Sequence, residues 1–287
     1  MAYYGSIEAG GTKFVCAVAD ENLTILDRVS LPTTLPEETL AKVFDFFDAY
    51  QLRALGVGSF GPIDVNETSD TYGYITSTPK QGWQNVDFLG KLRQHYNIPM
   101  AWTTDVNAAA YGEMHLGAGK NTQSCIYLTV GTGVGGGAVV NGHVLQGFSH
   151  PEMGHIPMER YPKDTLISSC PFHDHCLEGL AAGPALEKRT GIKGQLLEQT
   201  HDVWEIEAYY LAQALMSYTL TLSPEKIILG GGVMKQTQLF PKIRESLKKQ
   251  LGGYVSLPNL DEYVVGCELG DNSGTLGCLL LAKEQGV

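Results

Sequence analysis

The chain has 287 residues, 43% hydrophobic and 18% charged, which fits an ordinary globular protein with a sizeable core in one large domain or two. Its formal net charge of −11 argues against a nucleic-acid partner, which would call for a basic patch, yet backbone amides can still bind an anionic ligand. No apolar run approaches the roughly 20 residues of a membrane span, and the N-terminus lacks a signal-peptide pattern, so we expect a cytoplasmic protein with no membrane partner.

Strands and helices alternate along the chain, which predicts an α/β fold. The expected strands are two around a glycine turn within 5–20, then 24–31, 54–60, 100–103, 124–130, 138–141, 226–229 and 263–267. The expected helices are 36–51, 86–96, 106–116, 203–222, 239–251 and 275–283. The strand, glycine turn and strand of 5–20 return in 124–141, which predicts two similarly built halves.

Three glycine turns each follow an expected strand. Glycine lets backbone amides approach a phosphate closely, and threonine hydroxyls and a lysine ammonium add donors. A single glycine turn is more often a tight hairpin, and the G-x-G-x-x-G at 131–136 lacks the helix that a dinucleotide fold needs. Taken together, the three turns predict a nucleotide whose phosphates lie between two domains. The turns are Gly10-Gly11-Thr12-Lys13, 131–136 and Gly230-Gly231-Gly232.

Asp105 lies at an expected junction between a strand and a helix, where a carboxylate can point toward a bound substrate. Phosphoryl transfer to a hydroxyl needs such a carboxylate to accept the proton, and Mg²⁺ to neutralise the phosphates. An aspartate at this position is more often a helix N-cap. The two roles are compatible, so Asp105 is the candidate general base.

Residues 149–178 gather cysteines and histidines in one loop-like segment. Cys170, His173 and Cys176 have C-x-x-H-x-x-C spacing, and His155 supplies the fourth ligand that a closed tetrahedral zinc site needs. The alternatives are His175 in place of His173, a Cys170–Cys176 disulfide, or a chance cluster. The other four cysteines lie in apolar runs typical of reduced core thiols, which disfavours a disulfide.

Five ordered motifs resemble those of the ROK (repressor, open reading frame, kinase) family across nearly the whole chain. They are EAGGTK at 8–13, TDVNAAA at 104–110, LTVGTGVGGG at 128–137, EMGH at 152–155 and ILGGGV at 228–233. Within that family, TPKQGW at 78–83, HPEMGH at 150–155 and CPFHDHC at 170–176 look most like the bacterial fructokinases. The combination is far more specific than any single motif.

The resemblance implies a two-lobed actin/hexokinase-like (ribonuclease H-like) ATPase fold with a zinc-bearing loop, and a homodimer that binds Mg-ATP and a hexose between its lobes. The implied lobes are residues 1–117, completed by the C-terminal helix at 274–287, and residues 118–273. Asp105 is then the base for the 6-hydroxyl of D-fructose. The implied sugar-binding residues are Gly61, Asn107, Glu152, His155 and Glu178. The implied nucleotide-binding residues are Gly10, Gly11, Thr12, Lys13, Thr132, Gly133, Pro184, Gly230, Gly231 and Gly232. Zinc is implied to be structural, and His155 to bind both the metal and the sugar.

Three departures from the family pattern accompany the resemblance. Glu8 begins the first glycine loop where the family has Asp, and Thr104 replaces the Asn of family glucokinases, which disfavours glucose. The zinc segment has a histidine between its cysteines where the family usually has a third cysteine. A glucokinase, mannokinase or broad hexokinase is the runner-up. A sugar-responsive transcription regulator is disfavoured, since those relatives carry an N-terminal helix-turn-helix domain, and four protein ligands disfavour a zinc hydrolase.

Overall fold

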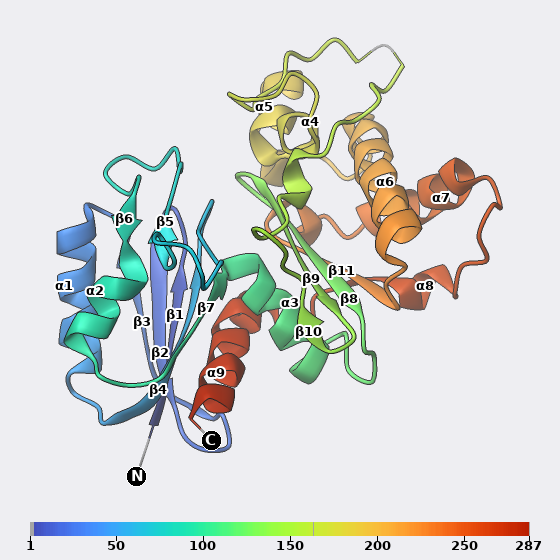
Figure 1. The fold of residues 1–287 in the computed structure, drawn as a ribbon. Coiled ribbons are helices and arrows are strands. Elements are labelled where there is room, and N and C mark those ends of the chain that lie inside the picture. The colour runs from blue at the N-terminus through green and yellow to red at the C-terminus, as the bar shows by residue number, and fades with distance from the viewer. Residues whose placement is uncertain (1–2, 163, 287) are drawn as a thin grey trace. The chain divides into compact units, whose positions relative to one another are not determined.

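The computed structural model describes residues 3–162 and 164–286. The chain forms two compact units of mixed α/β structure (Figure 1), which confirms the predicted class. Unit 1 consists of Met1–His115, Val144–Pro151 and Leu269–Val287. Unit 2 consists of Leu116–His143 and Glu152–Glu268.

Unit 1 contains a five-stranded sheet in the order β3-β2-β1-β4-β7. β1, β2 and β3 form an antiparallel meander, whereas β4 and β7 continue the sheet in parallel with β1. These strands are β1 (Tyr3–Ala9), β2 (Lys13–Ala19), β3 (Ile25–Pro32), β4 (Leu52–Ser59) and β7 (Met100–Thr104). A two-stranded hairpin of β5 (Tyr74–Ile75) and β6 (Val86–Asp87) is separate from this sheet.

The two faces of this sheet are packed differently. One face joins α1 (Pro36–Phe47) and α2 (Phe88–His95) in the main apolar core, which contains the fully buried Phe14 and Trp83. The other face carries small residues and receives α9 (Ser273–Gln285). A Cβ at Gly56 would lie 1.9 Å from the carbonyl oxygen of Cys278, so only glycine allows this close approach of helix and sheet.

Unit 2 repeats the strand arrangement of unit 1. Its sheet has the order β10-β9-β8-β11-β12, with β9 antiparallel to β8 and with β11 and β12 continuing in parallel. The strands are β8 (Cys125–Val130), β9 (Val134–Val140), β10 (His143–Val144), β11 (Lys226–Gly230) and β12 (Val264–Gly266). The two predicted halves therefore share one topology.

The helices of unit 2 include α6 (Val203–Leu222), whose buried residues lie on more than one side, as its sequence pattern predicts. The others are α4 (Leu177–Ala181), α5 (Gly183–Thr190), α7 (Leu239–Leu251) and α8 (Leu260–Tyr263). No helix in the described part of the chain is long and apolar enough to cross a membrane.

Several predicted elements differ from the observed ones at their ends. The helix expected at 36–51 ends at Phe47, and the helix expected at 86–96 begins at Phe88, since the Asp87 side chain caps it by accepting a 2.8 Å hydrogen bond from the Gly90 N–H. The strand expected at 263–267 is shorter because the Asn259 side chain accepts a bond from the Asp261 N–H and starts the short helix α8.

Candidate active site

Asp105 is the first residue of α3 (Asp105–Leu116), directly after β7. The Thr104 hydroxyl accepts a 3.1 Å hydrogen bond from the Asn107 N–H, so Thr104 caps the helix. The Asp105 carboxylate accepts a 2.9 Å bond from the Val106 N–H and is half-buried. Thr104 therefore provides the capping bond that was considered for Asp105, and the helix does not need the Asp105 carboxylate for that role.

Asn107 is 1% exposed, and its Oδ1 has no hydrogen-bond partner among the residues that the structure describes. A buried amide oxygen without a partner costs free energy, and such groups are rare unless a ligand or water completes them. Asn107 was expected to bind the sugar. A sugar hydroxyl is a suitable donor for this oxygen.

The first glycine turn joins β1 to β2 in unit 1. The Gly10 N–H donates a 2.9 Å hydrogen bond to the carbonyl of Lys13, and Gly11, Thr12 and Lys13 are exposed. Thr33 fixes this turn from outside, because its hydroxyl donates to the Gly10 carbonyl at 2.7 Å and its N–H to the Thr12 carbonyl at 3.0 Å. Exposed backbone and side-chain donors on a fixed turn are what a phosphate site requires.

Glu8 lies on β1, just before this turn. Its carboxylate accepts a 2.9 Å hydrogen bond from the hydroxyl of Thr275 at the start of α9. Burial raises the pKa of Glu8, and the Thr275 hydrogen bond offsets part of that rise. The longer glutamate side chain is thus tied to α9 at the position where the family pattern has aspartate.

The second and third glycine turns come together in unit 2. The Gly183 N–H, next to Pro184 at the start of α5, donates a 2.7 Å hydrogen bond to the Gly131 carbonyl. A Cβ at Gly131 would lie 3.9 Å from the backbone nitrogen of Gly232. Gly231 has φ +89°, and a Cβ there would lie 2.4 Å from the Val130 carbonyl oxygen, so this turn requires glycine. The expected nucleotide residues Thr132, Gly133, Pro184 and Gly230–Gly232 therefore form one neighbourhood.

Glu178, which is expected to bind the sugar, contacts the second glycine turn, and Glu152 lies near Glu178. The Glu178 carboxylate accepts a 3.1 Å hydrogen bond from the Val134 N–H. A Cβ at Gly133 would lie 2.6 Å from that carboxylate, so the missing side chain makes room for it. Partial burial, followed by the negative charge of Glu178, raises the pKa of Glu152.

The Cys/His cluster brings four possible metal ligands close together. One ligand atom from each of His155, Cys170, His173 and Cys176 lies within 4.8 Å of all the others. The Cys170 sulfur lies 3.9 Å from Nδ1 of His155 and 3.7 Å from Nδ1 of His173. Zinc–sulfur and zinc–nitrogen bonds at tetrahedral angles put these atoms about 3.6 Å apart. The donor set therefore fits zinc, and His175 is not part of this group.

The disulfide considered for this segment is absent, because Cys170 and Cys176 are free cysteines. Nδ1 is the ring nitrogen of His155 that faces the cluster, which leaves Nε2 as its second binding atom. His155 lies in the 3₁₀ helix Met153–His155, three residues after Glu152.

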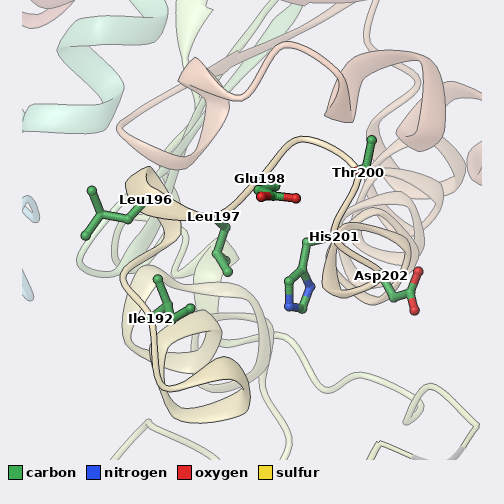
Figure 2. A pocket seen from close by; sticks show the side chains of 7 residues that line it. All are labelled: Ile192, Leu196, Leu197, Glu198, Thr200, His201 and Asp202. Atoms are coloured by element: carbon green, nitrogen blue, oxygen red, sulfur yellow. The ribbon is translucent and has the colours of Figure 1, made fainter.

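A pocket of about 450 Å³ lies in unit 2 on the loop between α5 and α6 (Figure 2). Ile192, Leu196 and Leu197 give it an apolar side, while Glu198, His201 and Asp202 add polar groups. This loop is linked to the segment after the third glycine turn, because the Gln236 side chain donates a 3.2 Å hydrogen bond to the Gly194 carbonyl.

The model of the ROK family matches residues 4–285. The chain belongs to the ROK family. A fructokinase from Pediococcus pentosaceus is 53% identical over 97% of both chains, and a fructokinase from Streptococcus mutans is 50% identical over 98% of this chain and 97% of its own. Among solved structures, a ROK hexokinase from Thermus thermophilus has a TM-score of 0.81 at 28% identity, covering 98% of this chain and 97% of its own. A ROK glucokinase from Streptomyces griseus, in complex with glucose and AMPPNP, has a TM-score of 0.78 at 25% identity, covering 99% and 100%.

Some of the expected site residues of this ROK chain lie on short sequence motifs, whereas other residues near them do not. Residues on short motifs, such as Asp105 and the glycine turns, can be found by pattern. Thr33 and His150 belong to no pattern that predicts a role in the site, although each holds a turn that carries expected site residues. The pocket in Figure 2 also gave no signal, since its lining is ordinary loop sequence.

Proposed function

We propose that the protein is an ATP-dependent fructokinase that transfers the γ-phosphoryl group of ATP to the 6-hydroxyl of D-fructose, giving fructose 6-phosphate and ADP. The observation that carries this proposal is a half-buried Asp105 at the start of a helix capped by its neighbour, in a chain about 50% identical to proteins named fructokinase. The Asp105 carboxylate accepts the hydroxyl proton as the sugar oxygen attacks phosphorus. The bond from the γ-phosphorus to the bridging oxygen then breaks, and ADP leaves.

The proposed base and sugar-binding residues belong to both units of the chain. Unit 1 contributes the base, and Gly61 and Asn107 for the sugar. Unit 2 contributes Glu152, His155 and Glu178 for other sugar hydroxyls. The most direct support for a sugar-binding residue is the Oδ1 of Asn107, which has no hydrogen-bond partner within residues 3–162 and 164–286. Carboxylates suit this task because they accept hydrogen bonds from hydroxyl groups.

Nucleotide binding is assigned to the three glycine turns. The proposed phosphate-binding residues are the exposed Thr12 and Lys13 of unit 1, and Thr132 and Gly133 of unit 2. Pro184 and Gly230–Gly232 would flank the adenosine. The hydrogen bond between Gln236 and Gly194 links the segment after the third glycine turn to the pocket of Figure 2, which makes that pocket a candidate site for the adenine ring. Mg²⁺ comes with the nucleotide as Mg-ATP and neutralises phosphate charge.

We also propose that His155, Cys170, His173 and Cys176 hold a structural zinc ion. Four protein ligands close the coordination sphere, which is typical of a structural rather than a catalytic site. A metal bound at Nδ1 of His155 would fix the ring and direct Nε2 toward a sugar hydroxyl. A His155→Ala protein with full zinc content and normal sugar affinity would contradict both roles.

A glucokinase, mannokinase or broad-specificity hexokinase is the second candidate, because the Streptomyces griseus relative is a glucokinase with bound glucose. Its 25% identity is half that of the fructokinase relatives, so fructose is favoured. A sugar-responsive regulator is less supported than either kinase. We place the enzyme in the cytoplasm, where ATP is available. We also expect a homodimer, and light scattering on the purified protein would test this oligomeric state.

The deciding experiment is a coupled ADP-release assay with Mg-ATP and fructose, glucose, mannose or N-acetylmannosamine, run beside Asp105→Ala. We expect turnover with fructose, and a loss of about 10²–10⁴-fold in the variant because general base catalysis is removed. Preference for another sugar would keep the mechanism and replace the substrate. Absence of turnover with every sugar would overturn the kinase.

A further inference from the structure

His150 is a buried histidine whose ring is tied to the turn that contains Gly61. Its Nε2 accepts a 3.0 Å hydrogen bond from the Ile63 N–H, and the residue is only 7% exposed. A Cβ at Gly61 would lie 3.3 Å from Cε1 of the ring, so the ring also packs against that glycine. The imidazole therefore contacts both ends of the three-residue turn 61–63.

The hydrogen bond specifies the form of the ring. Because Nε2 is an acceptor, the proton of the neutral ring is on Nδ1, which lies 3.4 Å from the Pro151 carbonyl. Burial lowers the pKa of His150, and the Pro151 carbonyl opposes that change to a smaller extent. The neutral tautomer with an accepting Nε2 is the one that suits the turn.

The middle of the turn is held by Thr76. The Pro62 carbonyl accepts hydrogen bonds from the Thr76 N–H at 2.8 Å and from the Thr76 hydroxyl at 3.0 Å. These contacts hold the middle of the turn, whereas His150 supplies the acceptor for the Ile63 N–H. An N–H without an acceptor in this buried place would cost free energy, so the turn depends on the imidazole.

His150 also stands at a boundary in the chain. Residues up to Pro151 belong to unit 1, and unit 2 begins with Glu152, followed by His155. The ring thus anchors the segment in unit 1 two residues before the first expected sugar-binding carboxylate. One side chain thereby fixes the backbone at Gly61 and the start of the segment that carries Glu152.

We propose that His150 is a positioning residue for the sugar, acting through the Gly61 turn and through the start of the segment 151–155. This inference rests on the proposed kinase function. It predicts that loss of the imidazole weakens binding of the sugar and leaves binding of ATP unchanged, because Thr33 holds the first glycine turn by hydrogen bonds of its own.

The test compares wild type with His150→Leu, His150→Gln and the exposed control His143→Leu in the coupled assay. We expect His150→Leu to raise KM for fructose about tenfold, as for loss of a buried hydrogen-bond partner. KM for ATP should stay within twofold. His150→Gln should recover most of the loss, because its side-chain oxygen can accept the Ile63 N–H, and His143→Leu should match wild type.

An unchanged KM for fructose in His150→Leu would overturn the inference, as would equal increases in KM for fructose and ATP. If His150→Leu does not fold, His150→Gln decides by itself, since its KM for fructose must stay within about threefold of wild type. If the wild-type protein phosphorylates another hexose instead of fructose, KM of the variants is measured for that hexose. Wild-type protein inactive with every hexose overturns the proposed function, and only then does the inference fail with it.

Discussion

The hydroxyl of Thr104 accepts a hydrogen bond from the Asn107 N–H, 3.1 Å away, so the residue before the proposed base holds the first turn of α3. An Asn in that place, as in family glucokinases, is an equally good capping residue. The difference between Thr and Asn therefore need not alter the helix. It changes the side chain beside the proposed base.

Thr104→Ala should lower the free energy of unfolding by about 1 kcal/mol, since the cap is lost. Thr104→Ser and Thr104→Asn should stay close to wild type in stability, because each keeps an accepting oxygen. Urea denaturation of the three variants measures this. Equal stability of the Ala and Ser variants would show that the capping bond contributes little.

Trp83, in the motif TPKQGW, links its loop to the first glycine turn. Its indole N–H donates a 2.7 Å hydrogen bond to the Thr34 carbonyl, next to the residue that holds Gly10 and Thr12. Trp83→Phe keeps the aromatic packing and removes the donor. We expect KM for ATP to rise about fivefold, corresponding to one lost hydrogen bond.

Trp102→Phe is the matched control for this variant. Trp102 belongs to the same core, and its indole N–H donates a 2.8 Å bond to the Asp64 carbonyl, which is not part of the glycine turn. Both variants should lose stability from the smaller ring. Only Trp83→Phe should change KM for ATP, and a similar change in both would assign the effect to packing.

The third glycine turn allows a direct comparison of adjacent glycines. At Gly231, φ is +89° and an added Cβ would lie 2.4 Å from the Val130 carbonyl oxygen. A Cβ at Gly232 would have no atom of the described residues within 4 Å, its chain neighbours apart. Gly231→Ala should therefore destabilise by about 1 kcal/mol or more. Gly232→Ala should be neutral within about 0.5 kcal/mol in thermal unfolding. Equal effects would mean that the turn relaxes.

The sequence sufficed for features that depend on local chemistry. The glycine turns were predictable because only glycine fits a close backbone approach such as that at Gly231. The grouping of Cys170, His173 and Cys176 was predictable because these residues are three apart in the sequence. His150 was not predictable, since its partner Ile63 is 87 residues away along the chain. The capping residue of α3 could not be chosen either, because Thr104 and Asp105 are adjacent and both residue types cap helices.

The proposed zinc site can be tested ligand by ligand. Cys170→Ser and His173→Ala should lose bound zinc and unfold at a lower temperature, because a structural metal stabilises the fold that binds it. His175→Ala is the control and should keep one zinc ion per chain. Elemental analysis with thermal unfolding gives both readouts. Zinc retained by His173→Ala and lost by His175→Ala would exchange the two assignments, and a zinc-free wild type would remove the site.

Glu207 provides a prediction about pH. It is completely buried on α6, and neither carboxylate oxygen has a hydrogen-bond partner in the described ranges 3–162 and 164–286. Burial raises the pKa of Glu207 well above its usual range, and the charge of Arg189 opposes this only in part. The folded state therefore holds this proton more tightly than the unfolded chain does.

The sign of the effect follows from that difference in pKa. Below the unfolded pKa of about 4.3 both states are protonated, and stability falls as the pH rises from there toward the folded pKa. Glu207→Gln keeps the shape without the ionisation, so its Tm should exceed that of wild type by about 2 °C or more at pH 8, and by less at pH 5. Glu205→Gln, an exposed change on the same helix, should show no such widening. An equal difference between Glu207→Gln and wild type at both pH values would show that Glu207 does not ionise on unfolding.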